Sequence, residues 1–178
     1  MFVTCIVIPK NAPMVESTRQ IMLGSGGVGL MGCTDHTKFK EFKALLPDVC
    51  KSAMTTPDSQ FVFVMEELSE FLSPVEIDAV LAHEEGHYVH GHLDGSTGGI
   101  TANEEYEFAA DDYAVSVGHS PAVLAGALGN MGKFVMKYVG IPQYGDLGDD
   151  ILELLETNIK NSLAPRIARL EVQSNTIH

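Results

Sequence analysis

The stretch SPVEIDAVLAHEEGHYVHG, residues 73–91, decides the fold of this chain because it has a clear start, an apolar body and a clear stop. Ser73 is suited to cap a helix, Pro74 to occupy its first position, and Glu76 to complete a capping box. Apolar residues fill the body of the segment, and Gly91 is a plausible C-terminal stop. The pattern predicts a buried helix of about 17 residues.

The C-terminal half of this predicted helix carries His83-Glu84-Glu85-Gly86-His87, an H-E-x-x-H motif. Two histidines four residues apart project from the same helical face, one turn apart. Two neutral imidazoles at that separation can hold one zinc ion, and Glu84 beside them can activate a water molecule. Because the rest of the helix is so apolar, the polar set must face a special site rather than the bulk core.

A second helix is predicted downstream of the first. Thr101-Ala102-Asn103-Glu104 offers a capping box for its start, and Gly118 is a natural terminator. Ala110 and Ala114 lie within this segment and give it a narrow face. Small residues allow two helices to approach closely, which a short bond from a carboxylate to a metal ion on the first helix requires.

Glu107 on this second helix is the candidate third metal ligand, because a catalytic zinc takes three protein ligands and leaves one position for water. Asp111, four residues further along, is expected to accept the outer N–H of a ligand histidine. The alternative is that both residues belong, with Glu104, Glu105 and Asp112, to a solvated acidic face.

These segments resemble a known family of proteases. Residues 72–87, with His92 five positions on, look like the active-site helix of HtpX-like and CAAX-prenyl-endopeptidase metalloproteases. Residues 107–111 match the E-x-x-x-D segment of that family, and residues 166–170 resemble its R-I-x-x-L segment. The likeness covers roughly residues 60–172.

The resemblance implies a zinc-dependent endopeptidase of the gluzincin class, which hydrolyses peptide bonds with a metal-activated water. It implies His83, His87 and Glu107 as ligands of one zinc ion per chain, and Glu84 as the general base. The expected partner is then a protein or peptide substrate.

Two features depart from the pattern of the family. Its members usually carry transmembrane helices, whereas the most apolar stretch here, residues 122–138, contains lysines and glycines and predicts one or two core helices. The family also tends to place a histidine a few residues before R-I-x-x-L, where this chain has Lys160-Asn161-Ser162-Leu163. The donor for the transition-state oxyanion must therefore be another residue.

Arg166 is the first choice for this donor because the resemblance points to it, and the other candidates are Tyr113, His119 and Tyr144. The competing interpretation is an ordinary surface or salt-bridging arginine. Ile167 and Leu170 are spaced to anchor a helix in the core, so Arg166 would point away from them.

A second functional hypothesis is a non-catalytic zinc-binding scaffold or interaction protein on a protease-like fold. His90 lies on the same helical side as His83 and His87. If His90 or Asp94 closed the coordination sphere, no position would remain for water. A simpler interpretation of His90 and His92 is that they are polar residues near a helix end, where they favour the helix dipole.

Composition limits the remaining possibilities. The 178 residues fit one domain, residues 1–178, with a sizeable core. A net charge of −13 argues against binding to a phosphate backbone or an anionic membrane, so we expect no nucleic-acid partner and no membrane insertion. Three cysteines without metal-ligand spacing favour a reducing compartment. Because the N-terminus lacks a basic region and a long apolar run, we expect a cytoplasmic protein.

The whole chain is expected to form an α+β, mainly helical domain with a small sheet and, by the resemblance, a gluzincin or zincin-like metalloprotease arrangement. The strand before the active-site helix is expected at the lip of the cleft, where an extended substrate can add to the sheet edge. The glycine-rich segment is expected to be a loop or hairpin tip rather than a nucleotide site. Outside the two motif helices we expect strands at 2–8 and 60–64, helices at 37–46 and from 151, loops at 24–29 and 140–148, and either state at 14–23.

Overall fold

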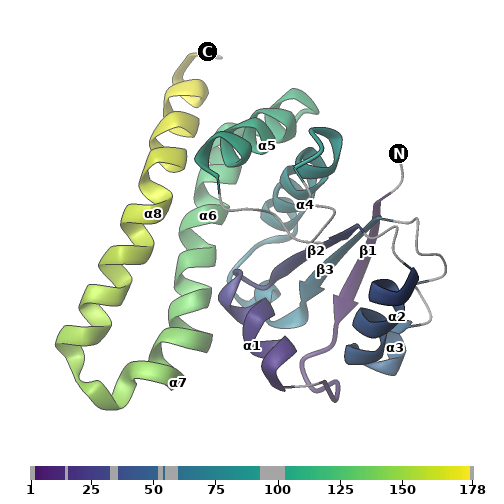
Figure 1. Ribbon diagram of the computed structural model, residues 1–178. Coiled ribbons are helices and arrows are strands. Elements are labelled where there is room, and N and C mark those ends of the chain that lie inside the picture. Colours follow the sequence, from purple (N-terminus) through teal and green to yellow (C-terminus); the bar gives the residue numbers. More distant parts are fainter. Residues whose placement is uncertain are drawn as a thin grey trace.

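The computed structural model describes residues 3–14, 16–32, 36–51, 54, 60–92 and 103–176. Helices predominate around one small sheet, so the predicted α+β class is confirmed (Figure 1). Two helices, α4 and α5, lie beside each other at one end of the sheet, and the long helices α6 and α8 run side by side on the flank of the molecule (Figure 1).

The sheet has three strands in the order β1-β3-β2. The central strand β3 (Gln60–Met65) pairs in parallel with β1 (Val3–Ile8) and antiparallel with β2 (Val28–Gly32). Residues 61–65 are all buried, as the apolar run suggests. Both strand predictions are confirmed, but the prediction that β3 lies at the lip of a cleft is wrong. Both of its edges are hydrogen-bonded to neighbouring strands, so β3 has no free edge for a substrate.

The ambiguous segment before the glycines is a helix, α1 (Glu16–Gly24). The glycine-rich segment then turns the chain directly into β2, with positive φ at Gly26 (82°) and Gly27 (84°). A Cβ on Gly27 would lie 2.9 Å from the ring of Phe134, so the turn is also packed against the core. It is therefore a loop that joins a helix to a strand, as one of the two expected alternatives had it, and not a hairpin tip. The predicted helix α2 (His36–Leu45) is confirmed, and a short α3 (Asp48–Lys51) follows it.

The helix that bears the motif begins and ends as predicted. After β3 the chain makes a short 3-10 turn, η1 (Glu66–Glu70), and enters α4 (Pro74–Val89). The Glu76 backbone N–H donates to the Ser73 hydroxyl, and the Glu76 carboxylate accepts from the Ser73 N–H at 2.8 Å, which completes the capping box. Gly91, at φ 69°, ends the helix.

The second motif helix is α5 (Glu104–Ser116), which begins two residues later than the predicted cap at Thr101 implies. Its N-cap is Asn103, whose side chain accepts from the Glu105 N–H at 2.9 Å. Thr101, the predicted cap, lies outside the described residues. The predicted stop at Gly118 is confirmed, because this residue has φ 109° and follows the last turn.

The C-terminal part is a pair of long helices joined by short helical turns. The long helices are α6 (Pro121–Val135) and α8 (Asp149–Thr176), joined through a π-helical turn η2 (Met136–Gly140), α7 (Ile141–Tyr144) and η3 (Gly145–Leu147). The predicted loop at 140–148 is thus largely helical. Leu170 of α8 is fully buried, as expected from its spacing. Within the described part of the chain, no helix has both the length and the apolar character needed to cross a membrane.

Candidate metal centre

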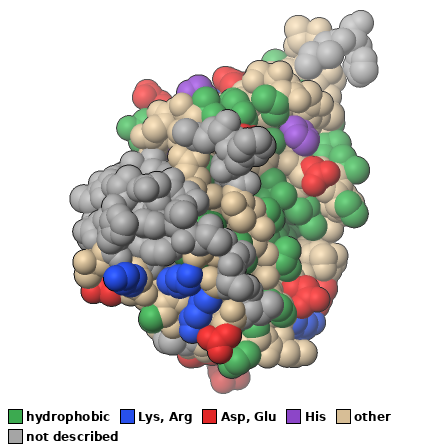
Figure 2. Space-filling view, turned by 90° about the vertical axis from the view of Figure 1, so that its right-hand side faces the viewer, with side chains coloured by type: hydrophobic (Ala, Val, Ile, Leu, Met, Phe, Trp, Pro, Cys, Tyr) green, Lys and Arg blue, Asp and Glu red, His purple; other side chains and the backbone are tan. Residues whose placement is uncertain are grey.

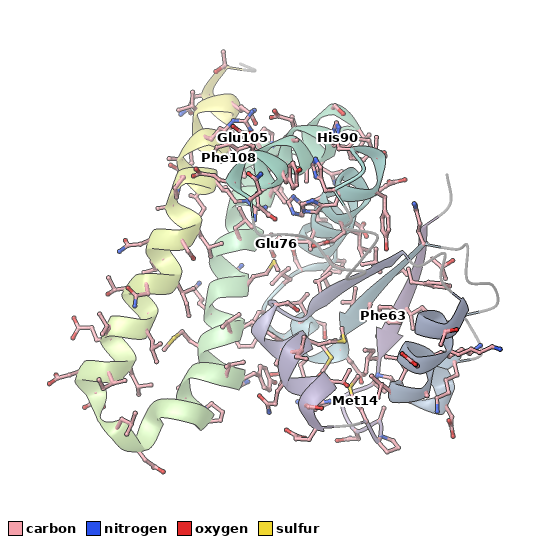
Figure 3. All side chains as sticks on the ribbon, viewed as in Figure 1. Met14, Phe63, Glu76, His90, Glu105 and Phe108 are labelled. Atoms are coloured by element: carbon pink, nitrogen blue, oxygen red, sulfur yellow. The ribbon has the colours of Figure 1, made fainter. Side chains whose placement is uncertain are left out.

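The two histidines of the motif and Glu107 meet between α4 and α5. Glu76 in the first turn of α4 and His90 at its C-cap mark the two ends of this helix in Figure 3, and Glu105 and Phe108 mark α5. The Nε2 atoms of His83 and His87 are 3.1 Å apart. Glu107 Oε2 lies 3.4 Å from the His83 Nε2, and its Oε1 lies 3.5 Å from the His87 Nε2.

These separations fit one tetrahedral ion. Zinc bonds of about 2.0–2.1 Å set neighbouring ligand atoms roughly 3.3–3.4 Å apart. The two histidine nitrogens, and the Glu107 oxygen that faces each of them, lie close to these distances. Two imidazoles and one carboxylate are also the donor set of a catalytic zinc site, which leaves a fourth position open.

A close approach of the two helices brings Glu107 to the histidines. Gly86 lies between them in the motif, and a Cβ there would be 2.9 Å from Ala110 Cα and 3.0 Å from Ala110 O. Ala110 and Ala114 are both fully buried. The small residues on α5 were predicted, but the role of Gly86 was not, because it occupies a variable position of the H-E-x-x-H motif. The signal that could have identified it is a glycine on α4 opposite the alanines of α5.

Both ligand imidazoles also have a partner on their other nitrogen. Asp111, which is fully buried, has Oδ1 2.9 Å from the His83 Nδ1. This contact is the one that an orienting carboxylate makes. The His87 Nδ1 lies 3.0 Å from the His92 Nδ1, a contact that the sequence analysis did not foresee.

Arg166 lies on α8 with its guanidinium against two carboxylates. Its Nε and Nη2 form hydrogen bonds of 2.9 and 2.7 Å with the two oxygens of Asp111, and its Nη1 lies 2.6 Å from Glu107 Oε2. These contacts match the competing interpretation of Arg166 as a salt-bridging residue. Of the other candidate donors, Tyr113 lies beside Glu85, His119 follows the end of α5, and the side chain of Tyr144 lies outside the described part.

The charges at the site favour a cation between the imidazoles. Burial opposes protonation of His83, but its hydrogen bonds to Asp111 and Glu107 prevail and raise its pKa to about 9. Burial and the neighbouring charge of His83 lower the pKa of His87 to about 4. Burial would raise the pKa values of Glu107 and Asp111, yet hydrogen bonds to His83 and the charge of Arg166 hold both below their usual range. The carboxylates are therefore charged and available as ligand and partner.

Glu84 is the remaining acid of the motif. Its pKa is raised, chiefly because burial disfavours the carboxylate, with a smaller contribution from the charge of Glu107. A raised pKa makes the Glu84 carboxylate a better proton acceptor than an ordinary glutamate.

The closed-site alternative finds no support in His90. Within the described residues, the group that could hold a metal consists of His83, His87 and Glu107. His90 is exposed at the C-cap of α4 and stacks on His92, with ring centroids 5.4 Å apart. Asp94 lies outside the described residues.

In the space-filling view, histidine and acidic side chains reach the surface toward the top, the end at which α4 and α5 lie (Figure 2).

Residues 52–103 match peptidase family M48. The match covers β3 and α4 with its H-E-x-x-H motif, and it confirms the resemblance to HtpX-like metalloproteases. It also indicates a peptidase. No curated protein and no solved structure matches the chain. The match ends before Glu107, so the third ligand depends on the geometry of α5.

The close approach at Gly86 predicts that Gly86→Ala weakens both the metal site and the fold. The added methyl group must push α5 away, which costs about 1–3 kcal/mol as overpacking and moves Glu107 from the histidines. Zinc affinity from a competing chelator and thermal unfolding measure the two effects. Gly129→Ala on α6 is the control, because a Cβ there meets nothing within 4 Å. It should stabilise the helix by about 0.5–1 kcal/mol and leave zinc affinity unchanged; equal behaviour of the two variants would contradict the prediction.

The contact between Asp111 and His83 predicts that Asp111→Ala weakens zinc affinity by roughly 10–100-fold, the usual cost of losing an orienting partner. Asp112→Ala is the matched control, because Asp112 points away from the site to Arg169 (2.5 Å) and Gln173 (2.9 Å). Titration of both variants with zinc compares them directly. A similar loss in both would mean that the general acidity of α5 matters, and not this one hydrogen bond.

Proposed function

We propose that this chain is a zinc-dependent endopeptidase of the gluzincin type, with one zinc ion held by His83, His87 and Glu107. The observation that carries the proposal is the convergence of three donor residues from two helices, whose nitrogen and carboxylate oxygen atoms lie 3.1, 3.4 and 3.5 Å apart, close to what one tetrahedral ion requires. The match to a peptidase family supports the same reaction class.

When bound, zinc would supply Lewis acidity, which polarises the scissile carbonyl and lowers the pKa of water from about 15.7 towards 7. In this proposal Glu84 moves the proton. One oxygen of its carboxylate takes a proton from the attacking water and then gives it to the nitrogen of the leaving amine. A general base of this kind contributes roughly 10²–10⁴ in rate. The raised pKa of Glu84 supports the first half of this transfer, because a more basic carboxylate takes the proton of the attacking water more readily.

Arg166 is proposed to hold the two acids of α5 in place. Its side chain is largely buried and neutralises Asp111 and Glu107 together. Without this cation, two carboxylates would face each other across one turn of α5, and the Glu107 oxygens would turn away from the imidazoles. Stabilisation of the oxyanion by Arg166 is the second hypothesis for this residue. The two hypotheses predict different effects of removing Arg166 on the affinity for zinc.

The general-base role predicts that Glu84→Gln separates metal binding from chemistry. Wild type and variant should each bind about one zinc ion per chain, because Glu84 is not a proposed ligand. Cleavage of casein or a peptide library should fall by about 10²–10⁴ in the variant. Glu85→Gln, on the neighbouring position beside Tyr113, is the control and should retain activity.

Undiminished cleavage by Glu84→Gln would contradict the mechanism. Zinc binding by wild type without chelator-sensitive cleavage of any substrate would favour the scaffold hypothesis. Retention of full zinc affinity by Glu107→Ala would show that the third ligand is a different residue.

The salt bridges of Arg166 predict that Arg166→Ala loses both zinc affinity and stability. Removing one partner of a buried ion pair costs about 3–5 kcal/mol, and Glu107 loses the partner that orients it. Zinc titration and thermal unfolding test this. Arg169→Ala is the control, because Arg169 lies about one helical turn further along α8 and pairs with the exposed Asp112. Intact zinc affinity and stability, with turnover lowered by about 10²–10³, would instead support the role as oxyanion donor.

A further inference from the structure

The second ligand histidine has an unusual neighbour. His83 is held by a carboxylate, whereas the Nδ1 of His87 lies 3.0 Å from the Nδ1 of His92. His87 is almost fully buried, so this nitrogen needs a partner from the protein. In sequence His92 follows the end of α4 and would ordinarily point into solvent.

The end of α4 returns His92 to His87 by a defined backbone motif. Gly91 adopts φ 69°, and its N–H donates to Tyr88 O at 3.1 Å. The N–H of His92 donates to His87 O at 2.9 Å, across five residues. These two bonds with a left-handed glycine form a Schellman motif. The motif therefore sets the backbone of His92 against the residue whose imidazole it contacts.

The ring of His92 stacks against two other rings. It stacks on Tyr106 of α5, with ring centroids 4.2 Å apart and planes 8° from parallel. It also stacks on His90, with centroids 5.4 Å apart and planes at 21°. Contacts from two helices therefore fix the direction of its Nδ1.

We propose that His92 is a positioning residue that orients the imidazole of His87 for metal binding, and that Gly91 is required to put it there. The inference rests on the proposed role of His87 as a zinc ligand. If His87 uses Nε2 for the metal, it carries its proton on Nδ1, and the Nδ1 of His92 accepts that proton in a hydrogen bond. His92 then holds its own proton on Nε2. A neutral acceptor fixes the ring without adding another negative charge beside Glu107 and Asp111.

The end of α5 supplies an internal control. Gly118 has φ 109°, its N–H donates to Val115 O at 3.1 Å, and the N–H of His119 donates to Ala114 O at 3.1 Å. This is the same motif with the same following residue type, but it returns to an alanine. Among the described residues, a Cβ at either glycine would meet no atom within 4 Å, so the common cost of substitution by alanine is the backbone strain of positive φ.

The experiment compares His92→Ala, His92→Asn, Gly91→Ala and Gly118→Ala. Zinc affinity is measured with a competing chelator, ligand geometry by the visible spectrum of the cobalt-substituted protein, and stability by thermal unfolding. His92→Ala should weaken zinc binding by roughly 10–100-fold and alter the cobalt spectrum. His92→Asn should recover part of both, because its Oδ1 can accept in place of the imidazole nitrogen. Gly91→Ala and Gly118→Ala should lose similar thermal stability, but only Gly91→Ala should lose zinc affinity.

Wild-type zinc affinity and an unchanged cobalt spectrum in His92→Ala would overturn the inference and leave the proposed function intact. Equal losses of zinc affinity in Gly91→Ala and Gly118→Ala would also overturn it, because the effect would then be one of general stability. Failure of the wild-type chain to bind zinc would overturn the proposed function first, and this inference with it.

Discussion

The contact between Gly86 of α4 and Ala110 of α5 is the constraint on which the candidate site depends. With a Cβ at position 86 the helices could not approach as they do, since it would lie 2.9 Å from the backbone of α5. The approach allows the short side chain of Glu107 to reach two imidazoles on the other helix. A metal ligand set of this kind needs placement within a few tenths of an ångström, and here backbone contact between two helices supplies it.

The buried charges tie this pair of helices to the rest of the molecule. Arg166 reaches Asp111 and Glu107 from α8, so the long C-terminal helix is part of the site although none of its residues is a proposed ligand. Hydrogen bonds to His83, together with the neutralising charge of Arg166, explain how the two carboxylates keep low pKa values although they are largely buried. Helix α8 therefore contributes to the electrostatics of the candidate site, since it carries the cation that balances the two carboxylates of α5.

The sheet supports α4, the helix that carries both histidines of the candidate site. Strand β3 is buried along its length and leads through η1 into the start of α4. Near the end of that helix, the Tyr88 hydroxyl donates to Phe61 O at 2.6 Å, which joins α4 to the first residues of the strand. Because β1 and β2 cover both edges of β3, the central strand acts as a support for the helix, and any strand-like substrate would have to use an outer edge of the sheet.

The sequence by itself determined the features that depend on neighbours within one helical turn or one strand. The capping box at Ser73, the stop at Gly91, the pair His83 and His87, and the strand at 60–65 could all be predicted, because capping, periodicity and turn bonds act over short distances. Only the tertiary structure decided which residues from different elements meet. The partners of Arg166, the central place of β3 and the contact at Gly86 follow from packing between α4, α5, α8 and the sheet. The contact between the His92 and His87 rings depends on the backbone turn at Gly91 and on stacking of His92 against Tyr106. Such contacts join positions far apart in the chain, or turn on one backbone angle, and no local pattern encodes them.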